Sequence, residues 1–323
     1  MTPRSILAVT DFSQAGDHAL ARAAQLSVQH GAQLKLLCVA YPGEPLPPDA
    51  VSRLELHALQ LGLRHDLDVR YESRIAFSPQ DVAASAAWAD LLVWGTAPLS
   101  GMRAFLMGQP VQAVLRHCAR PVLVVRRPAR RPYASLIVAV DFSEASQSLV
   151  ELGFNLNPGA QVELLHAINT ANERKLRNAE ATEQAVAAYR EQCLHRARVR
   201  MSRLTGACDA LPDRVISSIH HGSPARQVLD RQERSGAELI VVGRYPASAA
   251  SDFMFASTAQ RVLRESSADV LVAPHARQGR RSADAAATRS VPQPLGVRRL
   301  RAGPPQPPSL PNPAAMPAKP ESI

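Results

Sequence analysis

The chain repeats itself, and this repeat restricts its fold more than any other feature of the sequence. Residues 6–15 (ILAVTDFSQA) return 130 positions later as residues 136–145 (LIVAVDFSEA). Further matches follow in the same order, at offsets of 128, 145 and 148: GAQLKLLCVA with GAQVELLHAI, SP with SP, DLLVWG with ELIVVG, and VLRHCARPVLVV with VLRESSADVLVA. A preserved order of matches indicates a duplicated domain.

The duplication divides the chain into four parts. At 323 residues the chain is too long for one ordinary core. We expect a first domain over residues 1–127, a linker over 128–134, a second domain over 135–275 and a tail over 276–323.

Short runs rich in Val, Leu and Ile alternate with helical stretches in each copy. In the first copy these runs are SILAVTD, QLKLLCV, DVRYES, DLLVWG and PVLVVR. Near-continuous apolar residues are typical of strands buried on both faces of a parallel sheet. We therefore expect an α/β fold with two tandem doubly wound, five-stranded parallel-sheet domains of the Rossmann-like type. Expected helix caps are Ser13, Ser78, Ser143, Ser223, Gly31 and Gly159.

The second copy is longer than the first. The offset rises from 128 to 145, which places about 17 extra residues within residues 172–205. This stretch is rich in Ala, Glu, Arg and Gln, with neither Pro nor Gly before Gly206. It predicts one long helix with a solvated charged face.

The basic charge of the chain is concentrated in the tail. The formal net charge is +9, of which residues 276–323 supply +6, from eight basic residues against Asp284 and Glu321. The tail also holds 10 of the 26 prolines and no aromatic residue. Such a segment buries too little apolar surface to offset its ordering entropy, so we expect it to be disordered. Binding of nucleic acid through this tail is an alternative function, but no aromatic residue is present for base stacking.

The remaining composition favours a cytoplasmic protein. The four cysteines (Cys38, Cys118, Cys193 and Cys208) form no CxxC pair, which favours reduced thiols. No apolar run reaches the roughly 18 residues that span a bilayer, and Asp11 interrupts the first apolar stretch before it reaches signal-peptide length.

In doubly wound sheets a ligand lies at the carboxyl ends of the strands, where the strand order reverses. Asp11 and Asp141 end the first strands of the two copies, and Gly95 and Gly243 end the fourth strands. A carboxylate that faces a glycine-bearing loop is suited to a nucleoside. In the alternative interpretation, each aspartate only organises the turn into the first helix.

These residues resemble a known family. The V-x-D-x-S opening, GA-x-L-x-LL after the first crossover and the VLR-x(5)-VLVV ending are similar to universal stress proteins in their tandem form, over about residues 3–275. The resemblance implies a stress-response protein, which in some members binds ATP through G-x-x-G-x(9)-G-[Ser/Thr]. It implies that Asp11 and Asp141 face the nucleoside, that Val39 and Ala167 line the adenine pocket, and that the terminal strands Pro121–Arg126 and Asp269–Pro274 pair antiparallel within the chain.

Both copies depart from the phosphate-binding pattern. In copy one Gly95 and Gly108 fit, but Pro98 and Gln109 replace a glycine and the hydroxyl residue. In copy two Gly243 and Ser257 fit, while Pro246 and Ala256 replace glycines. Proline removes a backbone donor and fixes φ near −65°. We therefore expect degenerate nucleotide-binding loops and no bound cofactor, with ATP as the alternative ligand.

No catalytic or metal constellation recurs between the copies. His220 and His221 are adjacent in a predicted strand and point to opposite faces, so they do not jointly chelate a metal. We expect a non-enzymatic universal stress protein that binds an unidentified protein partner and does not associate with a membrane. An ATP-binding member with slow hydrolysis is the alternative.

Overall fold

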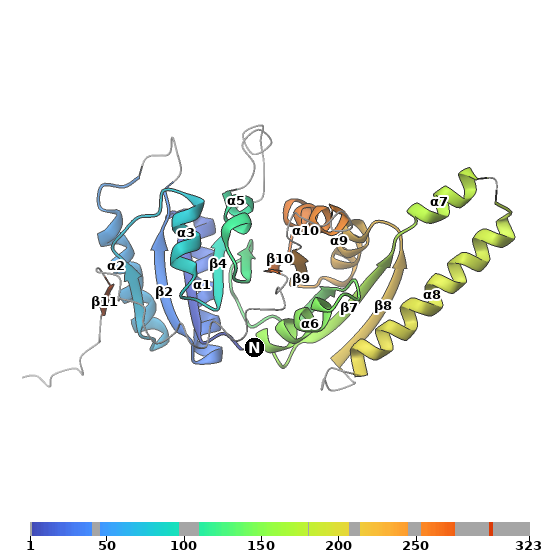
Figure 1. Cartoon of the computed structure of the whole chain (residues 1–323). Coiled ribbons are helices and arrows are strands. Elements are labelled where there is room, and N and C mark those ends of the chain that lie inside the picture. The colour runs from blue at the N-terminus through green and yellow to red at the C-terminus, as the bar shows by residue number, and fades with distance from the viewer. Residues whose placement is uncertain are drawn as a thin grey trace, which may run out of the picture.

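The computed structural model describes residues 2–40, 46–96, 110–179, 181–206, 214–244, 253–274 and 297–299. These residues form one sheet of 11 strands in the order β11-β3-β2-β1-β4-β5-β10-β9-β6-β7-β8, with helices on both faces (Figure 1). Each domain contributes five parallel strands. If the strands of a domain are numbered along the chain, they lie side by side in the sheet in the order 3-2-1-4-5 in both domains. The expected fold class is confirmed.

The strands lie where the apolar runs predicted them. Domain one contributes β1 (Ser5–Thr10), β2 (Gln33–Cys38), β3 (Val69–Glu72), β4 (Leu91–Gly95) and β5 (Val122–Val125). Domain two contributes β6 (Ser135–Ala139), β7 (Gln161–Ile168), β8 (Val215–His221), β9 (Leu239–Arg244) and β10 (Asp269–Pro274). All four residues of β5 and all but the last residue of β10 are buried, as expected for strands covered on both faces.

The helices cover the two faces of the sheet separately. One face carries α1 (Gln14–His30), α2 (Ala50–His65), α6 (Ala145–Leu156) and α8 (Glu183–Gly206). The other face carries α3 (Pro79–Ala86), α5 (Pro110–His117), α9 (Pro224–Ser235) and α10 (Phe253–Glu265). Each face therefore has its own apolar core, and both cores extend across the two domains.

Several helix ends follow the sequence, and others do not. Ser13 accepts a hydrogen bond from Gly16 N, and Ser78 forms a reciprocal capping box with Asp81. Gly31 ends α1 in the left-handed conformation, with φ of 61°.

The corresponding predictions for the first helix of copy two are wrong. The N-cap of α6 is Glu144, and no side chain caps the first turn of this helix, although the Ser143 hydroxyl donates to Asp141 as the Ser13 hydroxyl does to Asp11. Its C-cap is Asn157 in an extended conformation, two residues before Gly159. Ser223 is the N-cap of α9 as expected, although its side chain makes no capping hydrogen bond.

The two domains join through their last strands. β5 pairs antiparallel with β10, and Leu123 lies opposite Leu271. An arginine of each domain also bonds to a carbonyl at the end of the other domain's last helix. Arg126 donates to Leu263 O, and Arg244 donates to Cys118 O at 3.0 Å. A guanidinium at a helix carboxyl end complements the exposed carbonyls and the helix dipole there.

The extra segment of copy two forms two helices, which corrects the prediction of one. α7 (Ala171–Asn178) is followed by α8, and together they project from domain two (Figure 1). The break has a local cause, because Thr182 Oγ1 accepts a hydrogen bond from Ala185 N at 3.2 Å and starts a new helix.

Three residues of the tail are described, and they form a strand. β11 (Val297–Arg299) pairs antiparallel with β3 at the edge of domain one. This differs from a tail without regular structure; the other tail residues lie outside the described part of the chain. No helix among the described residues is both long enough and apolar enough to span a membrane.

Candidate functional site

The carboxyl ends of the central strands bring the predicted residues together in each domain. Asp11 follows β1, which pairs with β4, the strand that ends at Gly95. Asp141 lies just beyond β6, which pairs with β9, the strand that contains Gly243. Because β1 and β6 each lie between the second and fourth strands of their domain, the strand order reverses at both places.

Both aspartates organise the turn that leads into the following helix. Asp141 Oδ1 accepts hydrogen bonds from Ser143 N at 2.9 Å, Ser143 Oγ at 2.7 Å and Ser146 Oγ at 2.8 Å. Asp11 Oδ1 accepts from Ser13 N at 3.0 Å and from the Ser13 hydroxyl. The turn role that the sequence left open as an alternative is therefore present in both copies, and it uses one oxygen of each carboxylate.

A residue with positive φ follows each aspartate. Phe12 and Phe142 have φ of 60° and 61°, a conformation that costs roughly 1–2 kcal/mol for a residue with a side chain. The Phe142 ring lies 4.2 Å from the His166 ring, and His166 Nδ1 lies 2.8 Å from Val140 O. Burial lowers the pKa of His166. His166 is therefore a packed, neutral side chain on the α6 side of β7.

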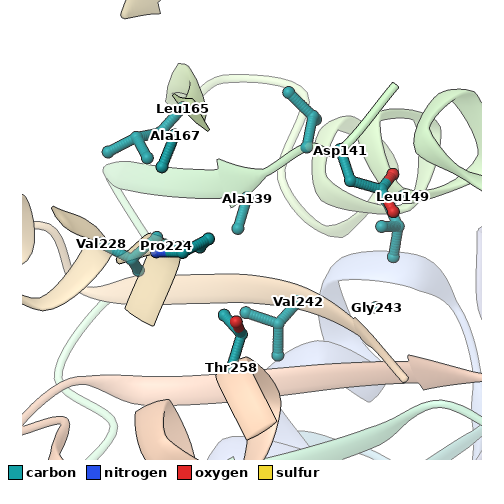
Figure 2. Close-up of a pocket in the computed structure, with 11 residues that line it drawn as sticks. Ala139, Asp141, Leu149, Leu165, Ala167, Pro224, Val228, Val242, Gly243 and Thr258 are labelled. Carbon is teal, nitrogen blue, oxygen red and sulfur yellow. The ribbon is translucent and has the colours of Figure 1, made fainter. Parts of the chain in front are cut away.

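A pocket lies at this edge of domain two. Figure 2 shows Asp141 and Leu149 on one side of the pocket and Pro224 and Val228 of α9 on the other. Its lining residues are Ala139, Val140, Asp141, Leu149, Leu165, Ala167, Pro224, Val228, Val242, Gly243 and Thr258. The structure thus places three predicted residues of copy two, Asp141, Ala167 and Gly243, in one pocket.

The pocket is apolar apart from two side chains. Among the described residues that line it, only Asp141 and Thr258 have polar side chains, and none is Lys or Arg. A carboxylate at the end of an apolar crevice accepts hydrogen bonds from hydroxyl or amine groups. It repels an anion unless a cation lies nearby.

Gly95 has a packing role that explains why a glycine is found there. A Cβ built on Gly95 would lie 1.9 Å from Ala15 O in the first turn of α1. No side chain fits at that distance, so Gly95 lets the end of β4 approach α1 closely. The same glycine was expected to open the phosphate loop of copy one.

The remaining predicted residues divide into two groups. Val39 is buried, with 5% of its surface exposed, and donates its N–H to Thr10 O at 2.9 Å, beside the end of β1. Ser257 lies in α10, one residue before the pocket residue Thr258. Gly108 and Gln109 lie outside the described residues, as do Pro98 and Pro246.

Sequence reasoning missed the residues that α9 and α10 contribute. Pro224 was predicted as the first residue of a helix, which is correct, but nothing in the pattern indicated that it lines a pocket. Val228 lies one helical turn later on the same face, so the spacing of four was the available signal. The family pattern pointed to Ser257, whereas the residue that lines the pocket is the next one, Thr258.

The two adjacent histidines of β8 have separate surroundings. His221 Nδ1 lies 3.6 Å from Glu173 Oε1, and Arg190 Nε donates to Glu173 Oε2 at 2.6 Å. His220 pairs in register with Ala167, and His221 with Ile168. Within the described part of the chain, no group of three or more His, Cys, Asp or Glu side chains is placed to hold a metal ion.

Comparison with solved structures supports the architecture. A universal stress protein from Archaeoglobus fulgidus DSM 4304 superposes with a TM-score of 0.59 over 84% of this chain and 99% of its own, at 16% identity. A functionally unknown protein, PA1789 from Pseudomonas aeruginosa PAO1, gives a TM-score of 0.58 over 84% and 92%, at 21% identity. At these identities the likeness establishes the fold alone.

Sequence relatives extend the comparison. Universal stress protein Mb2019 of Mycobacterium bovis and universal stress protein Rv1996 of Mycobacterium tuberculosis are each 28% identical over 177 residues. The matched region covers 52% of this chain and 53% of each relative, so the chain spans about half the length of the curated relatives it matches. Residues 3–126 and, separately, residues 132–274 match the model of the Universal stress protein family. Two consecutive matches, on the two halves that the repeat defines, mean that this chain belongs to the universal stress protein family as a tandem-domain member.

Proposed function

We propose that this chain is a stress-response protein that acts through binding and conformational state and catalyses no reaction itself. The observation that carries the proposal is the character of the domain-two pocket, where Asp141 is the one charged side chain among the lining residues that the structure describes. A triphosphate brought beside that carboxylate meets repulsion, and no Lys or Arg among the described lining residues offsets it. We further propose that it acts in the cytoplasm and binds another protein, whose identity is unknown.

The phosphate-binding loops point in the same direction. Pro98 stands at a glycine position of copy one and Pro246 at a glycine position of copy two. Each proline removes a backbone N–H, and Gln109 replaces a compact hydroxyl. A lost hydrogen bond to a charged phosphate costs roughly 1.5–3 kcal/mol, or about a tenfold to hundredfold loss of affinity.

Calorimetry with Mg-ATP and the full chain tests the proposal. We expect a dissociation constant weaker than about 1 mM for the unmodified protein, and at least tenfold tighter binding by the Pro98→Gly, Gln109→Ser double variant. The matched control is Pro128→Gly, which changes a proline in the linker between the domains. Micromolar affinity in the unmodified protein contradicts the proposal. A double variant that still fails to bind shows that these two residues did not close the site.

The second candidate function is an ATP-binding protein with slow hydrolysis. The observation that favours it is the position of Asp141 and Gly243, which line one pocket at a strand-order reversal. Native mass spectrometry of the freshly purified chain distinguishes the two functions, because a tight site retains nucleotide. A mass increase equal to one or two ATP molecules favours this candidate.

A further inference from the structure

The exposed face of α2 carries an apolar stripe. Leu56, Leu59 and Leu63 are 52%, 40% and 66% exposed, while Leu54 and Ala58 on the opposite face are buried. The spacing of three and four residues places the three leucines on one side of the helix. Surface leucines are common singly, but three on one helix face form a surface that is suited to a partner.

The duplicated chain provides an internal comparison. In domain two, α8 packs on the same face of the sheet as α2 does in domain one. Among the large apolar side chains of α8, only Val199 is exposed, at 38%. The exposed leucines are therefore a feature of α2 that α8, the helix on the same face of the sheet in domain two, does not share. Domain one also differs from domain two in the strand that joins its outer edge, since β11 pairs with β3.

The direction of β11 places its last residue at the end of β3 that is nearer in sequence to this stripe. β11 runs antiparallel to β3, with Val297 opposite Glu72 and Arg299 opposite Arg70. β11 therefore ends beside the beginning of β3, which three residues separate from the end of α2 at His65. Leu63, the most exposed leucine of the stripe, lies in the last turn of α2.

The residues that follow β11 have the chemistry to cover the stripe. Leu300 and Arg301 follow β11 in the sequence, and Asp68, just before β3, has a side chain that is 51% exposed. Residues 300–323 contain eight prolines together with Leu300, Leu310, Met316 and Ile323. A proline-rich segment is extended before it binds, so it loses little conformational entropy when it docks on an apolar surface.

The lengths are compatible. Leu56 and Leu63 are seven residues apart on the helix, or about 10 Å at 1.5 Å per residue. An extended proline-rich segment covers that distance with about four residues at 3.1 Å each. The tether supplied by β11 gives the segment a local concentration on the order of millimolar, which a second molecule reaches only at high protein concentration.

We propose that residues 300–313 of this chain dock on the leucine stripe of α2, formed by Leu56, Leu59 and Leu63. The β11–β3 pairing would hold this segment near the stripe, and the apolar contact would supply the docking. The proposal is independent of whether either domain binds a nucleotide.

Hydroxyl-radical footprinting of the intact protein tests the docking. The oxidation rates of the three leucines are compared in the full chain, in a chain that ends at Arg299, and in the full-length Leu300→Ser, Leu310→Ser variant. The shortened chain keeps β11, and the double variant keeps the length of the tail. Val199 on α8 is the internal reference. We expect the leucine rates to rise at least threefold in both altered chains, with an unchanged rate at Val199.

A second measurement uses the other side of the contact. Trypsin cleavage after Arg301 is timed in the full chain and in a Leu59→Gln, Leu63→Gln variant, and we expect at least threefold faster cleavage in the variant. Equal leucine oxidation in all three chains overturns the proposal. Protection that survives the truncation and grows with protein concentration also overturns it, because the occupant is then a second copy.

Discussion

Tyr133 Oη donates a hydrogen bond to Asp269 Oδ2 at 2.6 Å, across 136 residues of sequence, and both side chains are buried. Tyr133 lies in the linker before β6, and Asp269 begins β10. Asp269 Oδ1 accepts from Arg126 N at 2.8 Å, and the Arg22 guanidinium lies 4.0 Å from the centre of the Tyr133 ring. Burial raises the pKa of both Tyr133 and Asp269. One carboxylate therefore ties the linker, β5 and the last strand of domain two together.

The first prediction concerns this contact. Tyr133→Phe removes the donor and leaves Asp269 Oδ2 without this hydrogen bond in a buried site, which costs about 1–3 kcal/mol of unfolding free energy. Urea denaturation of the full chain measures it. The control is Arg131→Gln, which removes the 70% exposed partner of Glu238 and should change stability by about 0–1 kcal/mol. Equal effects of the two substitutions contradict the prediction.

The second prediction concerns Gly95. Gly95→Ala places a Cβ 1.9 Å from the Ala15 carbonyl, so β4 and α1 have to separate. We expect a loss of about 1–3 kcal/mol in unfolding free energy. Gly206→Ala is the matched control, since a Cβ there meets nothing within 4 Å and alanine favours the helix by up to about 1 kcal/mol. A neutral Gly95→Ala variant in thermal or urea unfolding would show that the packing relaxes.

The third prediction concerns an ion pair whose charges differ between the copies. Lys35 on β2 lies 3.8 Å from Glu72, whereas its repeat partner Glu163 on β7 accepts from Arg231 Nε at 2.8 Å. Glu163 is 7% exposed, so Arg231→Met leaves a buried carboxylate unpaired and should cost about 3 kcal/mol. The Arg231→Met, Glu163→Met double variant should recover most of that loss. Additive losses in the double variant would refute this explanation.

The fourth prediction concerns thiol reactivity. Burial, with a smaller contribution from Asp11, raises the pKa of Cys38 from 9.0 to about 11. At pH 8 about one Cys38 in a thousand is then a thiolate, and this fraction grows only as the pH approaches 11. In a Cys208→Ser background, iodoacetamide at pH 8 should label Cys193 on α8 while Cys38 remains unmodified. Peptide mass spectrometry reads this out, and comparable labelling of Cys38 and Cys193 would contradict the prediction.

The repeat predicted the strands well, because strands buried on both faces leave long apolar runs in the sequence. Helix ends were predicted correctly at Ser13 and Gly31, and wrongly at Ser143 and Gly159. Ser13 and Ser143 both donate their hydroxyl to the aspartate two residues earlier, but Ser13 also accepts the hydrogen bond that caps α1, a difference that the shared DFS sequence does not reveal. The break between α7 and α8 depends on one threonine hydroxyl, which composition does not reveal.

The site was predicted less completely than the fold. Asp141, Ala167 and Gly243 were found because strand ends converge in any doubly wound sheet. Pro224, Val228 and Thr258 come from helices on the other side of the crevice, and the tertiary packing of those helices decides which residues reach it. The packing role of Gly95 also escaped prediction, because it depends on the position of the Ala15 carbonyl.

The antiparallel joint between β5 and β10 lies within a single covalent chain. Two separate subunits that meet through such strands come apart when they are diluted, whereas the two halves of this protein face each other at a fixed local concentration. Their ratio is always one to one. Each half can therefore accumulate its own substitutions without losing the neighbour that covers its last strand. The sheet already shows one such difference, because Lys35 of the first half corresponds to Glu163 of the second.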